Sequence, residues 1–154
     1  MKKVNTNNFK KTLSKFSTGI TIVCVKNNNS IYGKTVNSFN SLSLNPPMVL
    51  FSLGNYSSSI MHFSKTKFLS INILSSKQKK LSNNFALTTP KLEDIKFVEG
   101  KNKTAIIPNC IANLECELME KIKKGDHIIF ICKILELQSN DKLKPLVYFN
   151  SKYF

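Results

Sequence analysis

Apolar residues in this chain alternate with polar ones or form short continuous runs, a pattern typical of β-strands rather than long helices. Turn sequences such as Asn27-Asn-Asn29 and Lys123-Lys-Gly-Asp126 separate several of these runs, and strands joined so closely run antiparallel. The pattern predicts a mainly β fold in one domain over residues 1–154, as either a closed barrel or a sandwich. We predict strands over residues 20–25, 30–37, 48–53, 68–74, 111–122, 127–137 and 146–149.

Helical periodicity is confined to short segments. Phe9, Leu13 and Phe16 share one face of a helix predicted over residues 7–16, with Thr6 as its N-cap. Ser75 and Gln78 have the spacing of a capping box, which predicts a helix continuing to about residue 84.

Two segments next to these helices are of interest for function. A short helix is predicted after residues 54–56, with Ser57 or Ser58 as its cap, and its first amides form a candidate phosphate site. Residues 85–103 show little periodicity, so we expect an irregular segment that covers a ligand.

Strict alternation fails between Val36 and Leu44. The apolar positions Val36, Phe39, Leu42 and Leu44 are spaced by three, three and two residues. We therefore expect a bend or bulge that leaves several backbone N–H groups unpaired. The neighbouring side chains are small and polar, which suits the binding of a polar ligand edge or a phosphate, although a plain loop between two core strands has the same composition. These polar residues are Thr35, Asn37, Ser38, Asn40, Ser41 and Ser43.

The formal net charge of +14 raises the possibility of nucleic-acid binding. All 23 basic residues are lysine, however, and arginine is the usual residue for bidentate contacts with bases and phosphates. The aromatic residues lie among apolar neighbours, as expected for a core. We therefore expect no nucleic-acid partner and keep a basic β-barrel that binds nucleic acid as an alternative.

The cysteines, the lengths of the apolar runs and residues 1–8 indicate the cellular compartment of the protein. Four cysteines without a CxxC pair, three of them in apolar runs, predict buried free thiols rather than a metal site or disulfides. No apolar run approaches the ~20 residues of a membrane span, and residues 1–8 lack the apolar core of a secretory signal. We expect a cytoplasmic protein without a membrane partner.

Several ordered motifs resemble those of one known family. The segment Gly33-Lys-Thr-Val-Asn-Ser-Phe-Asn-Ser-Leu-Ser-Leu-Asn-Pro-Pro47 resembles the signature of the flavin reductase family, the short-chain reductases that serve two-component flavin monooxygenases. The resemblance covers nearly the whole chain. The further matching segments, in the same order, are Phe16-Ser-Thr-Gly-Ile20, residues 68–86, Leu114-Glu-Cys116, Gly125-Asp-His127 and Pro145-Leu-Val-Tyr148.

The resemblance implies a fold and an activity. The fold is an antiparallel, Greek-key FMN-binding split β-barrel with a few short peripheral helices, and it forms a homodimer that holds flavin near the subunit interface. The activity is hydride transfer from NADH or NADPH to FMN or FAD, which supplies reduced flavin to a partner monooxygenase. Because the cofactors carry this chemistry, the protein needs to align them, and we assign no catalytic side chain and no metal.

The resemblance also implies site residues. The flavin ring and ribityl chain would contact Thr35, Val36, Asn37, Ser38, Ser41 and Ser43; the phosphate would face Asn55, Ser57 and Ser58; and the backbone of Phe85 and Ala86 would meet the flavin. His127, by itself most simply a structural residue at the start of a strand, and Tyr153 would lie beside the nicotinamide. A flavin-binding electron carrier with little NAD(P)H oxidation remains the second interpretation.

Overall fold

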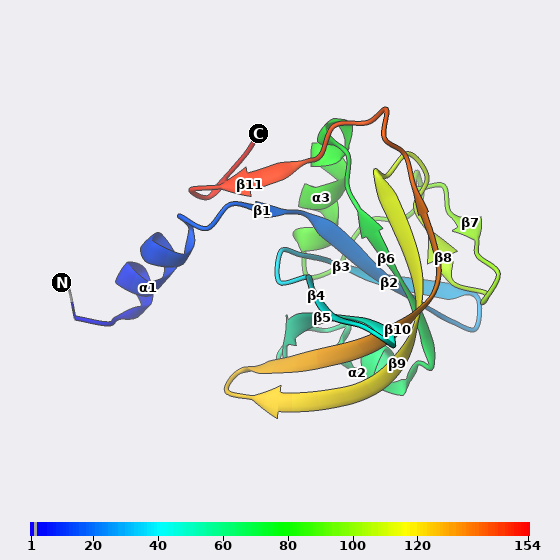
Figure 1. Cartoon of the computed structure of the whole chain (residues 1–154), viewed down its shortest axis with the longest axis horizontal. Helices are drawn as coiled ribbons and strands as arrows, with labels where there is room; N and C mark the ends of the chain where they lie inside the picture. Colours follow the sequence, from blue (N-terminus) through cyan, green and yellow to red (C-terminus); the bar gives the residue numbers. More distant parts are fainter. Residues whose placement is uncertain (2) are drawn as a thin grey trace.

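The apolar runs form antiparallel strands in a computed structural model that describes residue 1 and residues 3–154 (Figure 1). The prediction of a mainly β fold with a few short helices is confirmed. The strands are β1 (Thr18–Gly19), β2 (Thr21–Asn27), β3 (Ser30–Val36), β4 (Asn40–Leu44), β5 (Pro47–Gly54), β6 (Phe68–Ile73), β7 (Val98–Glu99), β8 (Ala105–Ile106), β9 (Ala112–Lys124), β10 (His127–Ser139), β11 (Val147–Phe149) and β12 (Lys152–Tyr153). The helices are α1 (Thr6–Leu13), α2 (Ile60–Lys65), the 3₁₀ turn η1 (Ser76–Gln78) and α3 (Lys79–Ala86).

One continuous sheet of seven strands, in the order β3-β2-β6-β9-β10-β5-β4, forms the body of the molecule. It curves round so that β3 approaches β5, which makes a barrel rather than the two stacked sheets of a sandwich (Figure 1). Two smaller sheets, β1-β11-β12 and β7-β8, lie at its margins.

The expected irregularity after Val36 is confirmed. The chain leaves β3 at Val36, β4 begins at Asn40, and the β4–β5 register shifts between Ser41 and Ser43, so that Leu42 is the extra residue of a bulge. β4 pairs with residues 47–50 of β5, and residues 51–54 extend beyond it. The last residues of β5 therefore have β10 on one side and no β4 partner on the other.

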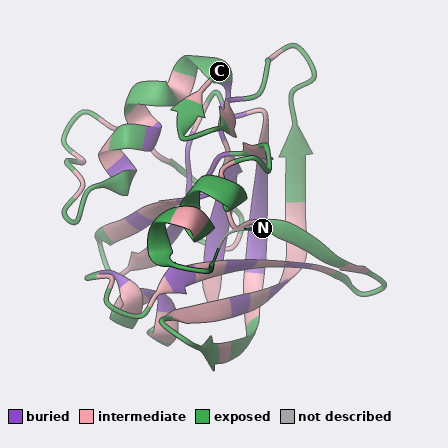
Figure 2. Cartoon of the chain, turned by 90° about the vertical axis from the view of Figure 1, so that its left-hand side faces the viewer, coloured by how far each residue is buried: buried purple, intermediate pink, exposed green. Residues whose placement is uncertain are grey.

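Apolar side chains form two cores that share strand β2, which is buried on both faces (Figure 2). Val23 and Val25 face the barrel core, where Phe51 and Phe130 stack with their ring centroids 5.1 Å apart. Ile22 and Cys24 face the second core, under α3. A strand buried on both faces explains the continuous apolar run in this part of the sequence.

Two predicted helix starts are wrong by a few residues at most. Asn5, not Thr6, caps α1, because its side chain accepts a hydrogen bond from the Asn8 amide at 2.9 Å. The cap of α2 is Ser59 rather than Ser57 or Ser58. The capping box of Ser75 and Gln78 is confirmed: it opens η1, which continues into α3.

Helix α1 lies apart from the barrel in Figure 1, and most of it is coloured as exposed in Figure 2. Its apolar stripe does not pack on the core, since Phe9 is 57% exposed and Leu13 is 54% exposed. The neighbouring Phe16 is 72% exposed. The periodicity thus predicted the helix correctly, but this face finds no partner in the described part of the chain.

The four cysteines are free and buried, as predicted. Burial raises the pKa of the Cys110 thiol to about 11 and that of Cys132 to about 12, so these thiols stay protonated. No helix among the described residues is long and apolar enough to cross a membrane. The same residues contain no cluster of three groups suited to hold a metal ion.

A test of the packing between β3 and α3 uses Gly33, where an added Cβ would lie 2.5 Å from Cε1 of the fully buried Phe85. We expect G33A to lower the free energy of unfolding by about 1–3 kcal/mol because Phe85 has no space to move. G19A is the matched control, since nothing lies within 4 Å of a Cβ there. Urea denaturation measures both variants, and equal stabilities would contradict the close contact.

Candidate functional site

A pocket of about 290 Å³ lies where the end of β3 separates from the end of β5. Both strands present an edge here: β3 is the last strand of the sheet, and β5 has passed the end of β4. Such edges carry unpaired backbone N–H and C=O groups. The residues that line the pocket are Lys34, Thr35, Val36, Asn37, Ser38, Ser52, Leu53, Gly54, Tyr56, Ser57, Ala86 and His127.

The Ser38 hydroxyl joins the segment after β3 to the edge of β5. It donates to the Ser52 carbonyl and accepts from the Ser52 amide, both at 3.0 Å. One side chain thus replaces a backbone partner on β5, and the pocket opens beside this bridge. A small hydroxyl is required, because a larger side chain would separate the strands.

Helix α3 forms a second wall. The Thr35 hydroxyl donates to the Ser82 carbonyl at 2.7 Å, and the Lys34 ammonium donates to the Leu87 carbonyl at 2.5 Å. Ala86, the last residue of α3, lines the pocket. The end of the helix is therefore fixed against β3 by two side chains that come from the pocket strand itself.

The turn after β5 forms the third wall. The Ser57 Oγ is buried and has no hydrogen-bond partner among the described residues. A buried hydroxyl without a partner is unfavourable, and a polar ligand in the pocket would satisfy it. The next residue, Ser58, donates through its hydroxyl to the Thr88 carbonyl at 2.9 Å.

His127 lies at the start of β10, opposite Gly54 of β5, and lines the pocket. Its ring is 45% exposed, and its Nδ1 lies 2.7 Å from Oδ1 of Asp126. This hydrogen bond lowers the pKa of the Asp126 carboxyl, which thus stays ionised and orients the ring. The Asn55 amide donates to the Asp126 carbonyl at 2.9 Å, so the turn after β5 is linked to the turn before β10.

The pocket brings together seven of the predicted site residues: Thr35, Val36, Asn37, Ser38, Ser57, Ala86 and His127. The others lie outside its lining. Ser41 and Ser43 are in β4, the Phe85 side chain is in the second core, and Asn55 and Ser58 are exposed beside the pocket. The Tyr153 hydroxyl lies 2.9 Å from Oγ of Ser82, so Tyr153 contacts the pocket wall from behind α3.

Sequence reasoning missed five lining residues: Lys34, Ser52, Leu53, Gly54 and Tyr56. Lys34 was detectable, because it lies two residues before Val36 and so on the same face of the strand. Tyr56 and Ser52 gave no signal in the sequence, since their positions depend on how β5 meets β3.

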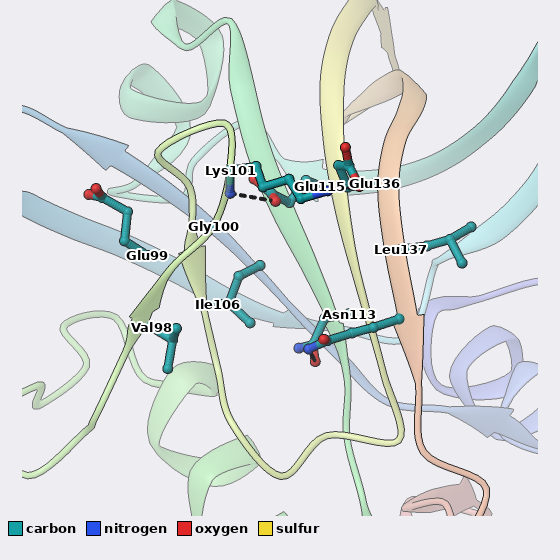
Figure 3. Close-up of a pocket in the computed structure, with 10 residues that line it drawn as sticks. Val98, Glu99, Gly100, Lys101, Ile106, Asn113, Glu115, Glu136 and Leu137 are labelled. Carbon is teal, nitrogen blue, oxygen red and sulfur yellow. Dashed lines mark hydrogen bonds and ion pairs between the residues drawn. The ribbon is translucent and has the colours of Figure 1, made fainter.

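A second cleft, of about 350 Å³, lies between the β7–β8 hairpin and strands β9 and β10 (Figure 3). It contains the buried Glu115 together with Glu136 and Lys101. A buried carboxylate in a cleft is a candidate catalytic group, so its hydrogen bonds decide its role.

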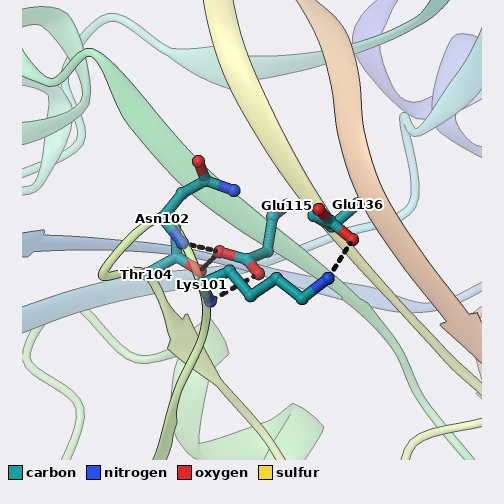
Figure 4. Close-up of polar contacts among 5 residues, drawn as sticks. All are labelled: Lys101, Asn102, Thr104, Glu115 and Glu136. Atoms are coloured by element: carbon teal, nitrogen blue, oxygen red, sulfur yellow. Dashed lines mark hydrogen bonds and ion pairs between the residues drawn. The ribbon is translucent and has the colours of Figure 1, made fainter.

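Glu115 binds its own chain (Figure 4). It accepts from the amides of Lys101 and Asn102, each at 2.9 Å, and from the Thr104 hydroxyl at 2.7 Å. Lys101 in turn pairs with Glu136, at 3.0 Å. These contacts use the carboxylate to hold the loop between β7 and β8, which is a structural role.

The pocket beside His127 therefore has the chemistry of a binding site. It offers strand edges, neutral hydroxyls, an amide side chain and one ammonium group, and it has an apolar floor of Val36 and Leu53. These groups suit a ring with polar edges, and they include no nucleophile activated by a base.

Comparisons with known proteins point to one family. The model of the flavin reductase like domain matches residues 13–154. The FMN reductase (NADH) SmoA of Agrobacterium fabrum is 33% identical over 137 residues, which are 89% of this chain and 79% of that protein. The reductase component of 4-hydroxyphenylacetate 3-monooxygenase from Thermus thermophilus is 31% identical, over 94% of this chain and 93% of that protein. The solved structure of the flavin reductase PheA2 in its native state superposes with a TM-score of 0.91 at 32% identity, covering 98% of this chain and 97% of that one.

Proposed function

Because the chain belongs to the flavin reductase family, we propose that it is an NAD(P)H-dependent flavin reductase that transfers a hydride from a nicotinamide to FMN or FAD. Family membership confirms the resemblance found in the sequence. The observation that carries the proposal is the pocket at the β3–β5 opening, because it gathers the polar motif of residues 35–38, the Ser57 hydroxyl and His127 around one space.

The pocket residues fit a flavin. The unpaired strand edges and the amide of Asn37 are suited to the carbonyl and N–H groups of the flavin ring. The buried Ser57 hydroxyl has no partner among the described residues, as expected of a group that binds a ligand oxygen. Asn55 and Ser58 lie beside it and extend this polar wall.

The chain's own contribution to the reaction is alignment. A flavin, when bound, would supply the hydride acceptor. The strand edges and hydroxyls of the pocket would hold its ring, and the residues of the turn after β5 would bind its phosphate. His127, oriented by Asp126, lies at the rim of the pocket, where it binds the nicotinamide by contact or hydrogen bond rather than by obligatory proton transfer.

We further propose that the reduced flavin passes to a separate monooxygenase. Several relatives, including the one from Thermus thermophilus, are named as reductase components of monooxygenases. We also infer that residues 1–154 form one domain and that the protein works in the cytoplasm, since its four free buried thiols suit a reducing compartment.

We propose that two copies complete the site as a homodimer. The pocket of about 290 Å³ lies just below the roughly 300–1,000 Å³ typical of ligand sites, so one chain encloses only part of a flavin. The exposed apolar stripe of α1 and the exposed Phe16 beside it supply a surface for a second copy.

The dimer is tested by light scattering of the purified protein at micromolar concentration. We expect a dimer, and we expect the double variant F9S/L13S to shift it toward monomer because the apolar stripe is lost. K10S, a polar change on the same helix, is the control and should stay dimeric. A wild-type monomer would contradict the proposal, and a dimer unchanged by F9S/L13S would remove α1 from the interface.

The activity is tested by following NADH and NADPH oxidation optically, with and without added FMN, FAD or riboflavin. We expect rapid oxidation that depends on flavin, and the rates rank both flavins and nicotinamides. A flavin that stays bound through purification, without NAD(P)H oxidation, would instead favour the electron carrier. If the protein showed neither NAD(P)H oxidation nor flavin binding, both the reductase and the electron-carrier interpretation would be refuted.

H127A tests the nicotinamide role. Loss of one hydrogen bond to the nicotinamide, about 1–1.5 kcal/mol, should raise its KM by roughly tenfold. The affinity for flavin, measured by fluorescence quenching, should change by less than about twofold, because the other pocket walls are intact. H62A is the control, since His62 stacks on Tyr32 outside the pocket. Equal losses of flavin and nicotinamide binding would rule out the assigned role.

A further inference from the structure

Lys34 is the one lysine among the described residues that line the pocket. The chain has no arginine, so an anionic group in this pocket has to be recognised by a lysine or by neutral donors. His127, the other pocket residue that can carry a positive charge, is already bonded to the Asp126 carboxylate. Lys34 is therefore the available cation in this space.

The contacts of Lys34 place its ammonium on the loop that Ser58 also holds. It donates to the Leu87 carbonyl at 2.5 Å, and the Ser58 hydroxyl donates to the next carbonyl, that of Thr88, at 2.9 Å. Consecutive residues are about 3.8 Å apart along the backbone. Lys34 and Ser58 thus hold adjacent points of one loop, and Ser57 comes directly before Ser58.

The charge of Lys34 is not balanced within the described part of the chain. Lys26, Lys67 and Lys101 each pair with a glutamate, whereas the described partner of Lys34 is a neutral carbonyl. No carboxylate lines the pocket. The ammonium donates to an exposed carbonyl and has no counter-ion among the described residues, so a charge-assisted hydrogen bond to a bound anion would be favourable.

We propose that Lys34 is the cationic ligand of the flavin phosphate and acts together with the Ser57 hydroxyl. This inference rests on the proposed function, and it adds a charged residue to a site for which only amides and hydroxyls were expected. The Leu87 carbonyl holds the ammonium at the pocket wall, so phosphate binding requires little rearrangement. Burial lowers the pKa of Lys34, and a phosphate beside it would favour the charged form again.

The test compares FMN with riboflavin, which has the same ring system but no phosphate. In K34M, the affinity for FMN should fall by about 10- to 100-fold, the range expected when a charge-assisted hydrogen bond is lost. The affinity for riboflavin should stay within about twofold of the wild type. K34R should recover most of the FMN affinity, because it keeps the charge. FMN binding by K34M should also depend less on salt than binding by the wild type.

The controls separate this proposal from the proposed function. K80M removes an exposed lysine of α3 outside the pocket lining and should leave both affinities unchanged. If K34M and the smaller change K34Q both lowered the affinities for FMN and riboflavin equally, Lys34 would only shape the pocket. If K34M left the affinity for FMN unchanged and raised the KM for NADPH alone, Lys34 would instead bind the 2′-phosphate of the nicotinamide cofactor. A wild-type protein that binds neither flavin would refute the flavin reductase assignment itself.

Discussion

The reciprocal hydrogen bonds between the Ser38 hydroxyl and the backbone of Ser52 join β5 to the segment that follows β3, and the site depends on this junction. A complete backbone ladder between β3 and β5 would close the barrel and leave no edge groups for a ligand. A complete separation would expose the barrel core around Phe51. One small side chain that both donates and accepts gives an intermediate geometry, in which the barrel is bridged at one point and open beside it.

The opening is held in shape by α3. Gly33 lets the Phe85 ring pack directly against β3, and Thr35 bonds the Ser82 carbonyl one turn earlier in the helix. Ser82 also contacts Tyr153, so the C-terminal hairpin supports the same helix. The wall that ends in Ala86 is thus fixed from the barrel side and from the tail side, which limits how far the pocket can widen.

The partners of the charged and polar groups distinguish those with a structural role from those available to a ligand. The net charge of +14 suggests a uniformly basic surface, yet several lysines are paired with glutamates, and the buried Glu115 is used to hold a loop. The cleft around Glu115 therefore contains paired groups. Among the described residues of the pocket beside His127, the Ser57 hydroxyl has no hydrogen-bond partner, and the Lys34 ammonium bonds a neutral carbonyl instead of a carboxylate. Thr18 also has a buried hydroxyl without a described partner, but it does not line the pocket, so the unsatisfied Ser57 hydroxyl indicates a binding site only together with the strand edges and His127 around it.

The sequence by itself determined seven of the strands, the break after Val36, the capping box at Ser75, the buried cysteines and the family, because these depend on local periodicity, turn chemistry and ordered motifs. It did not determine that β3 and β5 meet through Ser38 and Ser52, nor which serines face the pocket, because both depend on how the sheet curves. The sequence showed the apolar stripe of α1 but not that it is exposed, because periodicity identifies an apolar face and does not show what packs against it. Only the tertiary structure placed Lys34 next to the loop after α3, because the contact joins residues 53 positions apart.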